Sequence, residues 1–195
     1  MYEYIVLFVG LLFVVLIPWL IMEINRDKKR IKALAPVVLN IATISKQSNS
    51  QIEGVFRDAG FSIKYHGPND GQPFVLNMFM YSARPFFYLD LRKENFDTRI
   101  SKKIGFVREV EVGDEEFDAA FLLRTEARDR CKVYFSDEAK RTLVSTMYSL
   151  GYTLAFSTQG ILMTIPLQTN TPRPAIDQKK LSKCLESLRL LIDDN

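Results

Sequence analysis

The stretch YIVLFVGLLFVVLIPWLIM, residues 4–22, determines how we expect the rest of the chain to be organised. Its roughly 19 residues contain no charged side chain. A helix of this length, at about 1.5 Å per residue, spans roughly 28 Å, which is close to the hydrocarbon thickness of a bilayer. The stretch therefore predicts a transmembrane helix that tethers the remaining residues to a membrane.

The residues that flank this stretch predict its orientation. Tyr2, Tyr4 and Trp19 are of the aromatic type that favours the two membrane–water interfaces, so we expect them to anchor the helix there. The expected contacts with the membrane surface are basic and lie on one side only: Arg26, Lys28, Lys29, Arg30 and Lys32. Because basic residues stay on the cytoplasmic side, the sequence predicts a single-pass protein with its N-terminus outside and its C-terminal domain in the cytoplasm.

Two other interpretations of residues 4–22 fit less well. A cleaved signal peptide has a basic start, a shorter apolar core and a small-residue cleavage site, whereas this stretch follows Glu3 and ends in Pro-Trp-Leu-Ile-Met. A buried core helix of this length without a polar face would be unusual in a chain of 195 residues.

Length and charge set the domain organisation and exclude one class of partner. We expect an anchor at 1–25, a basic juxtamembrane segment and connector at 26–50, and one cytosolic domain at 51–195. The chain has 26 basic and 23 acidic residues. Leaving out the five basic residues above, with Glu3, Glu23 and Asp27, leaves 21 basic and 20 acidic residues. Such a near-neutral body argues against binding to nucleic acid, which needs a concentrated basic face.

The periodicity of the remaining sequence predicts an α+β fold. Residues 31–45 fit a helix slightly better than a strand. Further helices are expected at 51–59, 126–135, 136–150 and 177–192, and strands at 61–66, 74–81, 86–92, 105–112, 122–125, 152–156 and 161–165. Gly60 is expected to end the first of these helices, Ser136 to cap the third and Asp177 to cap the last. Since consecutive strands are joined by tight turns, we expect a mostly antiparallel sheet with helices packed on one face.

The last of these helices carries an apolar stripe at three- and four-residue spacing. The stripe consists of Leu181, Cys184, Leu185, Leu188, Leu191 and Ile192. Packing on the sheet is the favoured interpretation, because a monomer rarely leaves so many large apolar side chains in water. An exposed docking surface for a partner is the alternative.

No residue pattern in the sequence fixes a reaction. His66 is the only histidine, and Cys131 and Cys184 lack metal-ligand spacing, so we expect a surface histidine, two packing cysteines, no metal and no cofactor. The acidic residues Asp114, Glu115, Glu116 and Asp118 are expected to form a solvated turn that enters a helix. The aromatic residues Phe79, Tyr81, Phe86, Phe87 and Tyr88 are expected to be core residues rather than an exposed recognition surface.

One block of sequence resembles a known group of proteins. Its motifs are Val112-Gly113-Asp114-Glu115-Glu116-Phe117-Asp118, Phe121-Leu122-Leu123-Arg124, Phe135-Ser136-Asp137-Glu138 with Leu143, and Gly160-Ile161-Leu162. Residues 112–166 thereby resemble uncharacterised bacterial membrane-anchored proteins with a cytosolic domain of unknown function. Members of that group usually carry a second span and a Gly-rich region, which this chain lacks. The resemblance implies a bacterial, membrane-tethered domain and supplies no functional residues.

These observations lead to three hypotheses about function. The first is a non-catalytic interaction or assembly module that is held at the bacterial inner membrane and binds a protein partner. The second is an accessory subunit of a larger membrane complex. The third is an enzyme at the membrane surface in which Asp90, Glu109 or Asp118 performs acid–base chemistry.

Overall fold

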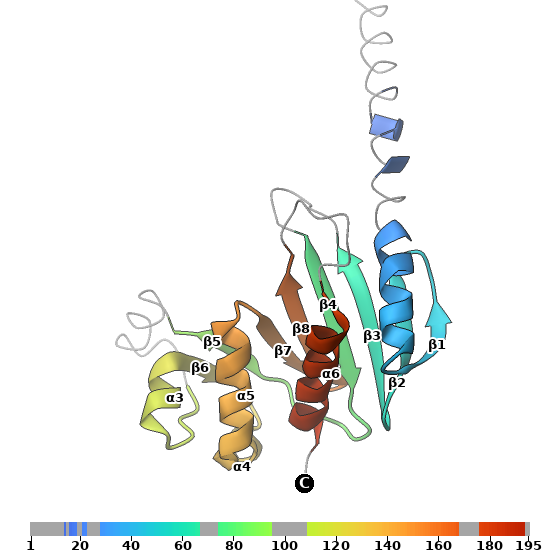
Figure 1. Ribbon diagram of the computed structural model, residues 1–195. Helices are drawn as coiled ribbons and strands as arrows, with labels where there is room; N and C mark the ends of the chain where they lie inside the picture. The colour runs from blue at the N-terminus through green and yellow to red at the C-terminus, as the bar shows by residue number, and fades with distance from the viewer. Residues whose placement is uncertain are drawn as a thin grey trace, which may run out of the picture.

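The computed structural model describes residues 14, 16–18, 21–22, 28–66, 74–94, 109–167 and 176–193. Its main sheet has six strands in the order β1-β2-β3-β4-β8-β7, and every neighbouring pair is antiparallel. A second sheet pairs β5 with β6. Figure 1 shows the helices gathered on one face of the main sheet. The predicted α+β class with a mostly antiparallel sheet is therefore confirmed.

The strands are β1 (Thr43–Gln47), β2 (Gln51–Phe56), β3 (Ala59–His66), β4 (Val75–Tyr81), β5 (Asp90–Lys93), β6 (Phe121–Arg124), β7 (Thr153–Ser157) and β8 (Gly160–Pro166). The helices after the N-terminal region are α3 (Glu115–Ala120), α4 (Arg128–Ser136), α5 (Glu138–Ser149) and α6 (Gln178–Ile192). An additional helix covers residues 28–39.

Alternating burial along the central strands explains why the helices cover a single face. In β3, the side chains of Phe61 and Ile63 point into the core, while Ser62 and Lys64 point to the other face. Burial alternates in the same way along β2 and β4. Because neighbouring residues of a strand point to opposite faces, one face of the sheet is apolar and needs covering, and the other remains open.

Two helices provide much of that cover. The helix at 28–39 buries Ile31, Leu34 and Val38 completely. Helix α6 packs on β4 and β8, and all six residues of its predicted apolar stripe are buried. Asp177 caps α6 as predicted, because its side chain accepts a hydrogen bond from the backbone N–H of Lys180 at 2.7 Å. The interpretation of this stripe as core is confirmed.

The largest error of the sequence analysis lies at residues 51–60. The predicted helix at 51–59 is wrong, since the segment forms β2, a two-residue turn and the start of β3. Gly60 does not end a helix but lies within β3. The ambiguous segment 31–45 divides into the end of the helix at 28–39 and the beginning of β1.

Smaller corrections concern the boundaries of other elements. Ser136 is the last residue of α4, and the residue that caps α5 is Asp137, whose side chain accepts from the N–H of Ala139 at 2.8 Å. In the strand predicted at 86–92, regular pairing begins only at Asp90. Within the strand predicted at 105–112, residues 109–112 are not strand and the others lie outside the described residues. The hairpin of β7 and β8 is confirmed.

The structure leaves the predicted anchor largely undescribed. Of residues 4–22, it describes positions 14, 16–18 and 21–22, and these are helical. No helix in the described ranges is both long and apolar enough to cross a membrane.

Candidate functional sites

The described part of the apolar N-terminal stretch is not covered by the body of the protein. Val14, Leu16, Ile17, Ile21 and Met22 have exposed fractions between 48% and 71%. Large apolar side chains gathered on one segment in this way indicate a surface that is covered by something other than water. The interface residues predicted at Tyr2, Tyr4 and Trp19 lie outside the described residues.

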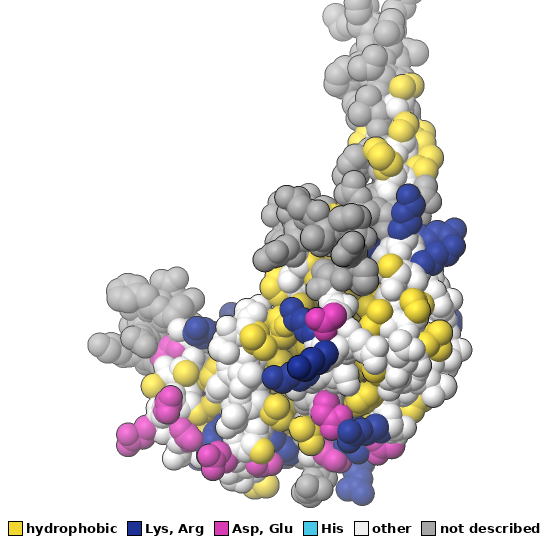
Figure 2. Space-filling view, in the orientation of Figure 1, with side chains coloured by type: hydrophobic (Ala, Val, Ile, Leu, Met, Phe, Trp, Pro, Cys, Tyr) yellow, Lys and Arg dark blue, Asp and Glu magenta, His cyan; other side chains and the backbone are white. Residues whose placement is uncertain are grey.

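The described basic residues lie at the start of the helix at 28–39, where the body of the protein begins. Lys29 and Lys32 are exposed, while Lys28 and Arg30 are half-buried. Figure 2 shows Lys and Arg side chains gathered at this junction. The guanidinium carbon of Arg30 lies 3.9 Å from the centre of the Phe74 ring, a distance at which a cation is attracted to the ring face. The structure thus brings four of the five predicted basic residues together, and Arg26 lies outside the described residues.

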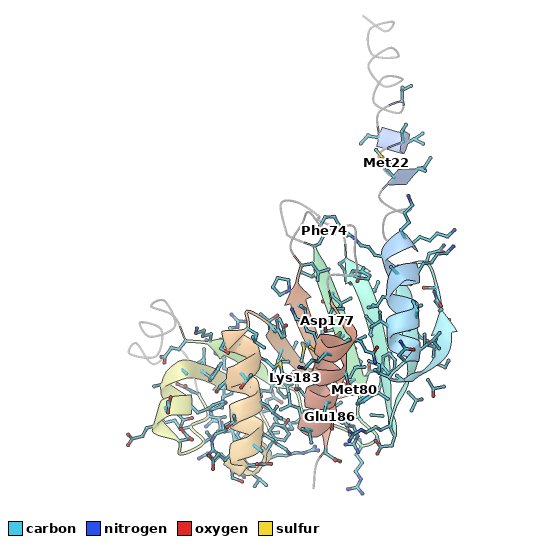
Figure 3. All side chains as sticks on the ribbon, in the orientation of Figure 1. Met22, Phe74, Met80, Asp177, Lys183 and Glu186 are labelled. Atoms are coloured by element: carbon cyan, nitrogen blue, oxygen red, sulfur yellow. The ribbon has the colours of Figure 1, made fainter. Side chains whose placement is uncertain are left out.

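A cluster of ion pairs lies at the opposite end of the body. Arg189 pairs with Asp58 at 2.6 Å and with Asp193 at 2.7 Å, and Arg57 pairs with Glu186 at 3.0 Å. Figure 3 shows Phe74 and Glu186 near opposite ends of the body. Hydrogen bonding from Arg189 lowers the pKa of Asp58, and the two carboxylates raise the pKa of Arg189. Asp58 and Arg189 also line a cavity of about 360 Å³.

The pairing of Arg189 limits what this cavity can do. Its guanidinium group already donates to two carboxylates. The negative charge of these carboxylates opposes an incoming anion, which makes the cluster better suited to fixing α6 against the turn at Arg57 and Asp58 than to binding an anionic ligand.

A larger cavity, which we call the arginine cavity, lies beside the β5–β6 sheet. It has a volume of about 650 Å³, and its lining includes Phe86, Phe87, Tyr88, Arg124, Arg128 and Arg130. Its volume lies within the range typical of ligand sites. No sequence pattern predicted this site, because the arginines and the aromatic residues are separated by about 40 positions and meet only when β5 pairs with β6. The Arg-rich run from Arg124 to Arg130 was the available signal.

The acidic segment at 114–118 has a structural role, as predicted. Asp114 caps α3 by accepting a hydrogen bond from the N–H of Phe117 at 3.0 Å, and this bond is the main cause of its lowered pKa. Arg141 pairs with Asp114 at 2.9 Å. Asp118 accepts hydrogen bonds from the N–H groups of Val112 and Gly113. Among the described residues, no cluster of three or more His, Cys, Asp or Glu side chains could hold a metal ion.

The other residues singled out from the sequence occupy varied positions. Cys131 and Cys184 are buried, as predicted, and burial raises their thiol pKa to about 12 and about 11. His66 is half-buried at the end of β3. The carboxylate of Asp90 accepts from Arg92 at 2.9 Å. Glu109 lies outside any helix or strand.

The prediction of an aromatic core is correct for only part of the set. Phe86 and Phe87 are buried and stack with their ring centres 4.9 Å apart. Tyr88 is instead 65% exposed, and Tyr81 is exposed on the open face of the sheet, where it contacts the half-buried Phe79. The exposure of Tyr88 fits the predicted alternation, since Phe87 and Leu89 on either side of it are buried. The exception is Phe86, which is also buried, because residues 85–88 are not paired as a strand.

Comparison with known proteins gives no relative. No protein-family model, curated protein or solved structure matches this chain. The resemblance of residues 112–166 to bacterial membrane-anchored proteins stays a prediction.

Proposed function

We propose that this chain is a membrane-tethered interaction module. A single N-terminal helix holds the α+β domain at the cytoplasmic face of a bacterial membrane, where the domain binds a protein partner. The observation that carries this proposal is the exposure of the apolar residues Val14, Leu16, Ile17, Ile21 and Met22, which a bilayer would cover.

The basic residues support a defined orientation. Lys28, Lys29 and Lys32 lie within about ten residues of the end of the apolar stretch, on a helix whose other side is buried in the domain. Each basic residue close to an anionic membrane surface contributes about 1 kcal/mol of attraction. The same residues favour the cytoplasmic side, which puts the N-terminus outside.

The shape of the domain supports a role in binding. One face of the main sheet is covered by helices, and its other face carries exposed or half-buried Val55, Phe79 and Tyr81 among polar residues. Tethering raises the effective concentration of such a domain toward partners at the same membrane.

A fractionation experiment tests the tether. Val14→Arg combined with Ile17→Arg places two charges in the apolar stretch, each at a cost of about 2.5–3.5 kcal/mol near the centre of a membrane helix. We expect this double variant to shift from the membrane to the soluble fraction. The matched control is Leu39→Arg, because Leu39 is also exposed but lies on the helix at 28–39. Equal membrane association of all three proteins would overturn the tether.

Cysteine labelling tests the orientation. The native Cys131 and Cys184 are buried, so the background reaction should be low. In whole cells, an impermeant thiol reagent should label Tyr2→Cys and leave Lys93→Cys unlabelled until the cells are broken. Labelling of Lys93→Cys alone in intact cells would reverse the proposed topology.

A further inference from the structure

The arginine cavity has a rigid aromatic floor. Phe86 and Phe87 are each only 3% exposed, and both rings contact Tyr134, at centroid distances of 5.5 Å and 5.4 Å. Phe86 also stacks on Phe156 at 6.0 Å. Because these rings are packed from below, the floor cannot collapse to fill the cavity.

Three arginines from two elements line the wall of this cavity. Arg124 ends β6, while Arg128 and Arg130 lie in the first turn of α4. The guanidinium group of Arg130 is held in place, because it donates to the carbonyl of Pro85 at 2.9 Å and lies 5.6 Å from the centre of the Phe87 ring. Arg128 is exposed.

Arg124 has unused hydrogen-bonding capacity. Its Nε is buried and has no hydrogen-bond partner in the structure as described. The residue opposite in the β-ladder, Asp90, already accepts from Arg92. A buried donor without a partner costs free energy, and the charge of the half-buried Arg124 makes a ligand carboxylate a favourable partner for its guanidinium group.

The start of α4 adds to the positive character of the cavity. Its N-cap residue, Ala127, makes no side-chain capping hydrogen bond. A helix N-terminus favours negative charge, and here it lies beside the same arginines. The carboxylates of Asp90 and Glu126 also line the cavity. Because the three arginines outnumber these two carboxylates, the cavity keeps a modest net positive charge. Such a charge suits a single carboxylate better than a doubly charged phosphate.

We propose that the arginine cavity binds an acidic peptide segment of a partner protein. A carboxylate of the peptide pairs with Arg124 and Arg128, and a neighbouring apolar side chain packs against the exposed ring of Tyr88. This inference rests on the proposed function, since it names the chemistry of the partner that the tethered domain binds.

The position of the cavity favours a peptide over a lipid. Figure 1 shows α4 at the end of the body remote from the start of the helix at 28–39. The basic residues that we assign to the membrane surface lie at that start. A bilayer in contact with them lies on the other side of the domain from α4.

A peptide selection tests this proposal. The full chain in nanodiscs is panned with a phage-displayed library of random 12-residue peptides, and enriched peptides are synthesised with a fluorescent label. We expect them to carry Asp or Glu close to Phe, Leu or Ile. Arg124→Gln and Arg128→Gln should each weaken their binding by at least about tenfold in fluorescence anisotropy, the scale of losing one charge-assisted partner.

Arg84→Gln is the matched control, because Arg84 is an exposed arginine that lines the other cavity. The affinity of this variant for the selected peptides should stay within about twofold of the affinity of the unchanged protein. Thermal melts identify any unfolded variant, and the exposed Arg128 provides a test that does not depend on the half-buried Arg124.

Three results would overturn the proposal: no enrichment, enriched peptides without acidic residues, or unchanged affinity in both cavity variants. A fourth result would also overturn it. If the cavity variants still bind the peptides but no longer bind phosphatidylserine vesicles, the cavity is a lipid site. Fractionation of the Val14→Arg and Ile17→Arg protein is independent of these measurements, so a failure of the tether and a failure of the cavity are distinguishable.

Discussion

Arg189, near the end of α6, donates two hydrogen bonds to Asp58, in the turn between β2 and β3, at 2.6 Å and 2.8 Å. These two residues are 131 positions apart, and their pairing fixes the last helix to the hairpin of β2 and β3. The same turn contains Arg57 with a φ of +57°, a conformation that residues other than glycine seldom adopt. The ion pair of Arg57 with Glu186 on α6 gives this strained residue a compensating contact.

We expect the pair of Asp58 and Arg189 to make stability depend on pH. Hydrogen bonding from Arg189 lowers the pKa of Asp58 below its ordinary value of 3.8. A carboxyl whose pKa is lower in the folded state contributes stability above its unfolded pKa, and loses it as the pH falls through the folded pKa. Asp58→Asn should therefore destabilise the protein at pH 7 and have a smaller effect at pH 2.5, which lies below the unfolded pKa. Urea unfolding at the two pH values measures this, and equal losses at both would contradict it.

Truncation of the core leucines of α6 should be costly. Leu185 and Leu188 are completely buried, so replacement of either by Ala should lower the free energy of unfolding by roughly 2–5 kcal/mol. Leu190 lies on the same helix but is 48% exposed, and Leu190→Ala should change stability by less than about 1 kcal/mol. Chemical denaturation of the three variants compares them directly. Similar effects at Leu188 and Leu190 would mean that α6 packs differently.

Gly160, at the start of β8, should not tolerate a side chain. A Cβ there would lie 2.0 Å from the carbonyl oxygen of Met80, and the residue has a φ of +149°. We expect Gly160→Ala to destabilise the protein by more than about 2 kcal/mol. Gly60→Ala is the control, because a Cβ on Gly60 would meet Tyr81 at an ordinary 3.5 Å. Denaturation midpoints that are equal for the two variants would argue against the close approach of Gly160 to β4.

The two thiols should be unreactive in the folded protein. Burial raises the pKa of Cys131 to about 12 and that of Cys184 to about 11, so almost no thiolate forms at pH 8. A thiol reagent such as Ellman's should react with both only after unfolding in guanidinium. Rapid reaction of one thiol under native conditions would show that its surroundings open locally.

The sequence predicts this fold well where a pattern has one interpretation. Asp177 and the six-residue stripe of α6 identify that helix because the cap and the period agree. The hairpin at Thr158 and Gln159 is equally clear, since short apolar runs flank a turn that ends in glycine.

Residues 51–60 could not be assigned in this way, because two periods coincide. Ile52 and Phe56 are four positions apart, as on a helix face, but they are also an even number apart and therefore share one face of a strand. A glycine at the first position of the turn would have indicated a hairpin, but Arg57 occupies it with a positive φ. The arginine cavity escaped prediction for a different reason, since it depends on strand pairing between distant segments.

The burial of Ile31 and Leu34 has a consequence for the reach of the domain. The body begins at residue 28, so only residues 23–27 separate it from the apolar stretch. Even fully extended, the chain from Met22 to Lys28 spans at most about 22 Å. If residues 4–22 cross the bilayer, the domain is therefore confined to a thin layer next to the membrane. Under the proposed tether, a partner that stays farther out than the domain's own length would not be recruited. Distance from the membrane would then restrict the choice of partner in addition to chemistry.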